Sequence, residues 1–287
     1  MAIVQTNEAS STLDSLRLRF NKVNLQLKWK QSDSARDART INILSIDGGG
    51  IRTIIPIIFL LELEIRTQRY TSSMFNLMGG TSFGSIVAAG LNFPTWVDET
   101  KPKYTSSDLL NLFHRHIKDI FAIKSILPPK YNYERTIKWV RRMKSEPTYN
   151  GEGFQIVLDK YFQMRKIDRL IRRTFIPIFD VNRDGTIWVE SDNLQTETEG
   201  YLVKEAIQAS SAAPGHFDSV KNERNEQVMV DGGSLYNNPV RYLIEKAMED
   251  GYQPKDIYVV SMGTGKVSMP AEMSSEEKMA KMAEHDA

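Results

Sequence analysis

Ile43-Leu-Ser-Ile-Asp-Gly-Gly-Gly-Ile-Arg52 places an apolar run directly before three glycines, and a helical pattern follows up to about residue 70. A second apolar run, residues 74–78, leads into Gly80-Thr-Ser-Phe-Gly84, and another helical pattern begins there. Two successive units of strand, tight turn and helix are typical of an α/β protein with a parallel sheet. The serine at the second turn indicates a hydrolase site.

The rest of the chain continues this alternation. We expect strands at residues 41–46, 74–78, 174–181, 186–190, 226–230 and 256–261, the last of them buried. We expect helices at residues 52–70, 83–92, 154–162, 203–213 and 239–250, and a less regular helical region at 106–145. Asp184-Gly185 is a strong hairpin signal between two of the strands. The fold class is therefore α/β.

Composition excludes cysteine-based sites, a secretory signal peptide and a membrane span. The chain has no cysteine, which rules out disulfides, thiolate metal sites and a cysteine nucleophile. The N-terminus lacks the basic and apolar regions of a secretory signal peptide. The longest apolar run, residues 54–61, is far shorter than the ~20 residues of a membrane span. We expect a protein that is cytoplasmic, or secreted without a classical signal peptide as bacterial effectors are, and peripheral at membranes, not transmembrane.

Charge is unevenly distributed along the 287 residues, although the net charge is only +1. Residues 101–175 contain 17 basic and 7 acidic residues, whereas residues 176–287 contain 10 basic and 20 acidic ones. The basic middle could meet phosphate-bearing partners, or it could form solvated helix faces. Residues 131–144 show the same ambiguity, because their basic amphipathic pattern suits a lipid surface as well as a helix that covers a sheet.

Ser82 is the candidate nucleophile. A serine hydroxyl reacts poorly unless the backbone presents it to a base and a substrate. Glycines on both sides permit a strained strand-to-helix turn that does this, and the N-terminus of the following helix favours developing negative charge. A plain turn of small residues is the alternative, because such turns are common.

Gly48, Gly49 and Gly50 expose backbone N–H groups at the start of a helix, as an anion or oxyanion site does. A dinucleotide site does not fit, since Thr53 stands where the last glycine of that motif is required. A P-loop is absent too, because Val260 stands where its first glycine is required.

Asp231 directly follows the strand at 226–230 and can reach the neighbouring strand end, where Ser82 lies. Its alternative role is to cap a turn. None of the histidines follows a carboxylate on a strand end in the hydrolase order of serine, acid and histidine, since the last one lies in the charged tail, and His216 alone is close to an expected active-site loop. The four are His114, His116, His216 and His285. A Ser82–Asp231 dyad is therefore favoured over a triad.

Together these motifs resemble the patatin-like phospholipase family. The match rests on five segments in the order of the family, which are Asp47-Gly-Gly-Gly-Ile-Arg52, Gly80-Thr-Ser-Phe-Gly84, Ala209-Ser-Ser-Ala-Ala-Pro214, Asp231-Gly-Gly233 with Asn237-Asn-Pro239, and Ser261-Met-Gly-Thr-Gly265. Two departures are mild: Thr53 follows Arg52 where the family commonly has glycine, and Ser85 replaces a frequent glycine after the serine turn.

The resemblance implies a three-layer α/β/α sandwich with a mostly parallel central sheet, and no metal ion or separate cofactor. It implies that Ser82 is the acyl-accepting nucleophile and Asp231 its base. Gly48, Gly49 and Gly50 would form the oxyanion hole, and Arg52 would order that loop or meet phosphate. An aspartate of ordinary pKa, ~3.9, is a weak base, so burial and the oxyanion hole would have to supply much of the rate.

The implied substrate is a membrane phospholipid or lysophospholipid, with peripheral membrane contact and no nucleic acid. Some relatives need an activator, so an unidentified activator is a further expectation. We expect residues 39–287 to form the catalytic domain, truncated at its C-terminus, and residues 1–38 to form an extension that is either a helix or a hairpin plus a linker. The alternative function is a non-catalytic lipid- or partner-binding module on the same fold.

Overall fold

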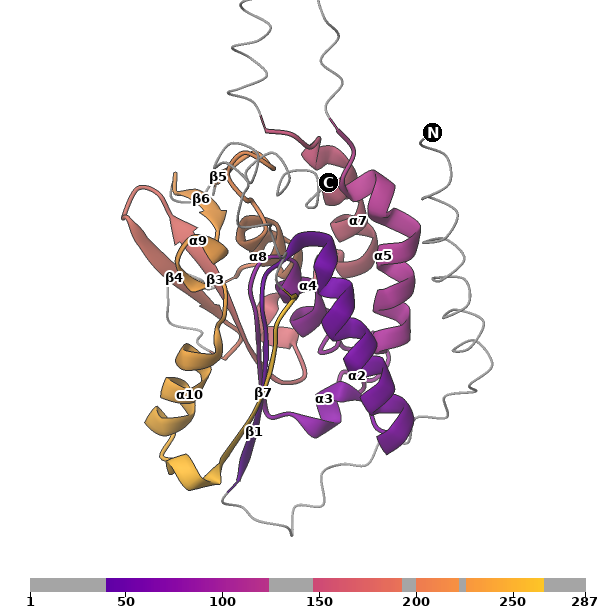
Figure 1. Ribbon diagram of the computed structural model, residues 1–287, viewed down its shortest axis with the longest axis vertical. Coiled ribbons are helices and arrows are strands. Elements are labelled where there is room, and N and C mark those ends of the chain that lie inside the picture. Colours follow the sequence, from indigo (N-terminus) through magenta and orange to yellow (C-terminus); the bar gives the residue numbers. More distant parts are fainter. Residues whose placement is uncertain (1–39, 124–146, 193–199, 222–225, 266–287) are drawn as a thin grey trace, which may run out of the picture.

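A computed structural model describes residues 40–123, 147–192, 200–221 and 226–265 (Figure 1). The expected extension at residues 1–38 and the basic segment at 131–144 lie outside these residues. Seven strands of the described chain form one mixed sheet in the order β5-β6-β3-β2-β1-β7, and β4 pairs with β3 off this path. They are β1 (Ile41–Ile46), β2 (Leu77–Gly80), β3 (Arg173–Asp180), β4 (Gly185–Glu190), β5 (Val220–Lys221), β6 (Val228–Asp231) and β7 (Ile257–Met262).

Parallel pairing holds the middle of the sheet together. β1 runs parallel to both β2 and β7, and β2 runs parallel to the first residues of β3. The pairs β3–β4, β3–β6 and β5–β6 are antiparallel. The central sheet is thus parallel over four strands and antiparallel at the β3 side.

Helices cover both faces of the sheet (Figure 1). On one face α4 and α8 contact the strands, with α2, α5 and α7 packed around them, and α10 covers the other face. The three-layer α/β/α sandwich is therefore confirmed. The helices are α2 (Ile54–Thr67), α3 (Thr71–Met74), α4 (Phe83–Gly90), α5 (Ser106–Ile120), α7 (Gly151–Phe162), α8 (Val203–Ser210), α9 (Gly233–Tyr236) and α10 (Val240–Glu249), with short 3-10 turns at Gly50–Thr53, Ile167–Arg169 and Pro254–Asp256.

The central strands are apolar on both faces because both faces are covered. In β1, Leu44 and Ile46 belong to the core under α2 and α4, whereas Ile41 and Ile43 belong to the core under α10. Helix α4 is buried along its whole length, which accounts for its lack of any charged residue. The helix behind Ser82 is thus fixed on all sides.

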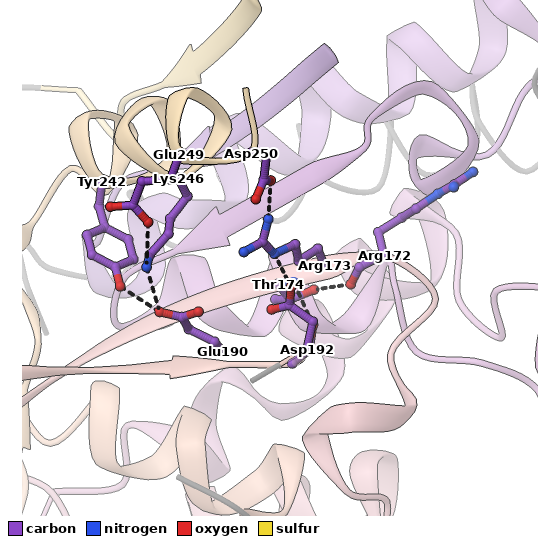
Figure 2. Close-up of polar contacts among 10 residues, drawn as sticks. Arg172, Arg173, Thr174, Glu190, Asp192, Tyr242, Lys246, Glu249 and Asp250 are labelled. Carbon is purple, nitrogen blue, oxygen red and sulfur yellow. Dashed lines mark hydrogen bonds and ion pairs between the residues drawn. The ribbon is translucent and has the colours of Figure 1, made fainter. Parts of the chain in front are cut away.

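A polar network fixes α10 against the β3–β4 hairpin (Figure 2). The Tyr242 hydroxyl donates to Glu190 Oε1 at 2.6 Å, and the Lys246 ammonium lies 3.6 Å from the same oxygen. Arg173 at the start of β3 forms ion pairs with both Asp192 and Asp250. These contacts tie the outer helix to two strands at once.

Glu64 of α2 joins three helices at their ends. Its carboxylate accepts hydrogen bonds from the backbone N–H and hydroxyl of Thr71, at 3.0 and 2.8 Å, and from the backbone N–H of Ser106, at 2.9 Å. Thr71 begins α3 and Ser106 begins α5, so one carboxylate satisfies the free N–H groups of two helices. The side chain is fully buried, and desolvation raises its pKa.

Two sequence expectations need correction. The apolar run at 74–78 does not start the second strand: residues Thr71–Met74 form α3, and β2 begins only at Leu77. The last strand is not buried, because β7 lies at the end of the strand order among the described residues, and Tyr258 is 59% exposed. Its apolar run fits an edge strand as well as a central one, which periodicity alone does not distinguish.

Candidate active site

Ser82 occupies a strained turn between β2 and α4. Its backbone has φ 52° and ψ −131°, a conformation that residues with a side chain rarely adopt. A Cβ at Gly80 would lie 2.2 Å from the Gly84 carbonyl oxygen, and one at Gly84 would lie 2.7 Å from the Ile46 carbonyl oxygen. The two flanking glycines are therefore required by close backbone contacts, and the strained turn expected from them is present.

β2 and β6 approach each other end to end along one side of β3. Gly79 of β2 pairs with Phe175, and Asp231, the last residue of β6, pairs with Ile178. The two strands run in opposite directions there, so their C-terminal ends meet. As a result the Ser82 hydroxyl donates a hydrogen bond to Asp231 Oδ2 at 2.6 Å.

Burial sets the charge behaviour of Asp231. Its side chain is 6% exposed, and desolvation raises its pKa to about 6. Hydrogen bonds from the Ser82 hydroxyl and the Gly233 N–H, together with the nearby His216, act in the opposite direction. Asp231 is thus a stronger base than an exposed aspartate and is still ionised at neutral pH.

Ser210, at the end of α8, holds the serine turn from behind. Its Oγ accepts the N–H of Ser82 at 3.0 Å and donates to the Pro177 carbonyl at 2.7 Å. It lies 128 residues from Ser82 in sequence, so sequence reasoning assigned it no role. Its place in the motif Ala209-Ser-Ser-Ala-Ala-Pro214 was visible in the sequence, but the motif does not indicate which atoms the Ser210 hydroxyl contacts.

The glycine loop after β1 is held by residues of two other motifs, Asn237-Asn-Pro239 and Ser261-Met-Gly-Thr-Gly265. The Gly48 carbonyl accepts the Thr264 hydroxyl at 2.9 Å and the Asn237 side-chain amide at 3.4 Å. A Cβ at Gly49 would lie 2.2 Å from Thr264 Oγ1, and Gly50 has φ +54°. Thr264 and Asn237 are therefore positioning residues for this loop, a role that the sequence did not reveal.

The three glycines are not equivalent as donors. The Gly48 N–H already donates to the Asn237 carbonyl at 3.1 Å, so it is not available to a substrate. For the N–H groups of Gly49 and Gly50, the described residues provide no hydrogen-bond acceptor. This narrows the expected oxyanion hole from three glycines to Gly49 and Gly50.

A cavity of about 330 Å³ connects these groups. One side is polar, with the glycine loop, Ser82 and Asp231, and Arg52 also lines it. The other side is aromatic, and its rings are those of Phe83, Phe121, Tyr149 and Phe217. Such a cavity can place an ester next to Ser82 and an apolar chain against the rings.

His216 also lines this cavity. The hydrogen bonds recorded for the Asp231 carboxylate within the described chain come from Ser82 and Gly233, not from His216. His114 and His116 lie on α5, and His285 lies outside the described residues. Within the described chain, Ser82 is thus hydrogen-bonded directly to Asp231, with no histidine between them.

The described part of residues 93–130 contributes one residue to the cavity that contains Ser82. Phe121 lines the cavity, whereas Trp96 and Val97 follow the C-terminal end of α4, opposite the end that holds Ser82.

Among the described residues, no helix combines the length and apolar character needed to cross a bilayer. The part of the chain that the structure describes also lacks a cluster of three or more metal-binding side chains.

Comparison with known proteins gives a consistent result. The family model for patatin-like phospholipases matches residues 44–244. Patatin-like protein 2 from Oryza sativa subsp. indica is 28% identical over 76% of this chain and 58% of its own length. Patatin-like protein 4 from Arabidopsis thaliana is 25% identical over 83% of this chain and 62% of its own length. The chain therefore spans about three fifths of the length of these relatives.

A solved structure, that of VipD from Legionella pneumophila, covers 86% of this chain and 53% of its own, with 12% identity and a TM-score of 0.38. This likeness is too distant to support an argument about the site.

Proposed function

We propose that this chain, which belongs to the patatin-like phospholipase family, is a lipid acyl hydrolase that works through an acyl-enzyme on Ser82. The observation that supports this most strongly is the 2.6 Å hydrogen bond from the Ser82 hydroxyl to the buried Asp231 carboxylate. It joins a serine on a strained turn to a base of raised pKa inside one cavity.

The proposed reaction has two steps. Asp231 takes the Ser82 proton while Oγ attacks the ester carbonyl, and the protonated Asp231 then gives that proton to the departing alcohol oxygen. Water, deprotonated by Asp231, attacks the acyl-enzyme in the second step, and the proton returns to Ser82 as the fatty acid leaves. One carboxylate thus serves as base and acid in turn.

The N–H groups of Gly49 and Gly50 are the proposed oxyanion donors. They begin the Gly50–Thr53 turn, where backbone donors lack intrahelical partners. Thr264 and Asn237 fix the loop before the substrate arrives, so its donors need no reorganisation in the transition state. Arg52 lines the same cavity and is proposed to support the loop or meet a substrate phosphate.

A phospholipid or lysophospholipid is the proposed substrate, bound with its acyl chain against the aromatic side of the cavity. Peripheral contact with a membrane and an unidentified activator stay predictions. A non-catalytic lipid-binding module on the same fold is the competing proposal, and it requires no reactive serine.

Hydrolysis of phospholipid vesicles separates the two. We expect the wild type to release fatty acid and Ser82→Ala to be slower by at least about 10³-fold, because the nucleophile is gone. Ser234→Ala is the matched control, since Ser234 lines the same cavity but has no role in the proposed reaction. Release of fatty acid at equal rates by the wild type and Ser82→Ala would exclude the proposed mechanism, and no release by the wild type would favour the binding module.

A further inference from the structure

A second cavity of about 310 Å³ lies next to the one that contains Ser82. Ser211 and Phe217 line both cavities, so these two side chains form the wall between them. Serine is small, so of these two shared residues Phe217 contributes most of the bulk between the cavities. Residues of α7, α8 and β5 also line the second cavity, namely Phe154, Gln208, Val220 and Lys221.

The Phe217 ring has a fixed place in this wall. It is buried, and its centroid lies 5.4 Å from that of Tyr149 and 5.7 Å from that of Phe154. It also lies 6.2 Å from the rings of Phe83 and Phe121. Its own backbone N–H donates to the Ala213 carbonyl at 2.9 Å, which closes the turn that carries it. Contacts on several sides thus hold the ring between the cavities.

The second cavity can receive apolar atoms. Phe154, Ala212 and Val220 contribute apolar surface to it, while its charged side chains, Asp218 and Lys221, are exposed to solvent. An acyl chain that leaves the ester at Ser82 along the aromatic side meets Phe217 before it reaches this space. Each further buried methylene would add to binding only if the wall were open.

We propose that Phe217 is a specificity-determining residue that limits the length of the acyl chain. The acyl chain of the substrate ends at the Phe217 ring. The second cavity would extend the acyl-binding space, but this ring closes it off. This inference rests on the proposed function, because it assumes an acyl ester at Ser82.

A chain-length series tests it, with p-nitrophenyl butyrate, octanoate and palmitate as probes. We expect Phe217→Ala to raise the ratio of kcat/KM for palmitate over octanoate by about tenfold or more. Phe217→Leu should give a smaller rise, and Phe217→Trp should lower the ratio. The ratio does not depend on the concentration of folded enzyme, so partial loss of folding does not hide the effect.

Val220→Trp supplies the control, because Val220 lines the second cavity and not the first. It should leave the ratio of the wild type unchanged and cancel the gain in the Phe217→Ala background. An unchanged ratio in Phe217→Ala and Phe217→Leu, or a gain that survives Val220→Trp, would overturn the inference while leaving the proposed function intact. Failure of the wild type to hydrolyse any of the esters would instead refute the proposed function.

Discussion

Asp231 is the residue whose ionisation should control the reaction. It accepts the Ser82 proton only as a carboxylate, and burial raises its pKa to about 6. Below that pH the carboxyl is protonated and the hydroxyl of Ser82 has no base. Activity should therefore rise with pH through about 6 and become constant above it.

The pH profile of kcat/KM measures this directly. We expect a rise of about tenfold per pH unit on the acid side, with a midpoint near 6. Asp231→Asn should lower activity by roughly 10²–10⁴-fold at every pH, because the base is lost. His216→Ala should keep the acid limb, since His216 lines the cavity without a recorded bond to Ser82. If the limb disappeared in His216→Ala and persisted in Asp231→Asn, the histidine would be the base.

At this scale the sequence predicted the candidate nucleophile and base but not the residues that hold them in place. Ser82 was recognisable because glycines flank it at a tight turn, and Asp231 because it ends an apolar run directly before two glycines. Ser210, Thr264 and Asn237 act through one or two hydrogen bonds to backbone atoms of distant segments. Such contacts leave no local pattern. The exclusion of Gly48 as an oxyanion donor likewise depends on the position of the Asn237 carbonyl.

Among the helices, α2 depends on Glu64 for its junction with α3 and α5. Glu64→Gln keeps the shape of the side chain but replaces one acceptor oxygen by an N–H₂ group. The N–H groups of Thr71 and Ser106 need acceptors on different oxygens, Oε1 and Oε2. One of these buried N–H groups would therefore lose its partner, which costs roughly 1–3 kcal/mol.

Urea denaturation at neutral pH checks this expectation. The free energy of unfolding of Glu64→Gln should fall by that amount relative to the wild type. Glu62→Gln is the matched control, because the side chain of Glu62 is 45% exposed and, among the described residues, pairs with Arg66 on the same helix alone. Its effect should stay within about 0.5 kcal/mol. Equal stability of Glu64→Gln and the wild type would show that the junction does not require the carboxylate.

Element prediction succeeded where a periodic run had a clear turn at its end. The first strand, Ile41–Ile46, ends at three glycines, and the β3–β4 hairpin turns at Asp184-Gly185 with φ 50° at Asp184. Prediction failed at residues 74–76, because Met74 ends the short helix α3 and β2 begins only at Leu77, although Met74 and Phe75 are as apolar as a strand requires. It also failed for the burial of β7, which depends on the neighbours of a strand and not on its own residues.

At the scale of the whole molecule, the proposed active site forms because β2 and β6 end at one place along β3. Ser82 and Asp231 are 149 positions apart, and parallel and antiparallel pairing must coexist on one side of a single strand to bring them together. The motifs predicted the participants and the α/β class. The strand pairing that brings Ser82 and Asp231 together depends on the complete sheet and not on either motif.

Covalent labelling of Ser82 by a fluorophosphonate tests the central claim most directly, because the probe reacts only with a serine activated by a base. We predict that peptide mapping of the labelled wild type will place one adduct on Ser82. Ser82→Ala should take no label, Asp231→Asn should label much more slowly, and Ser234→Ala should label as the wild type does. An adduct on another serine, or equal labelling of the wild type and Ser82→Ala, would contradict the account.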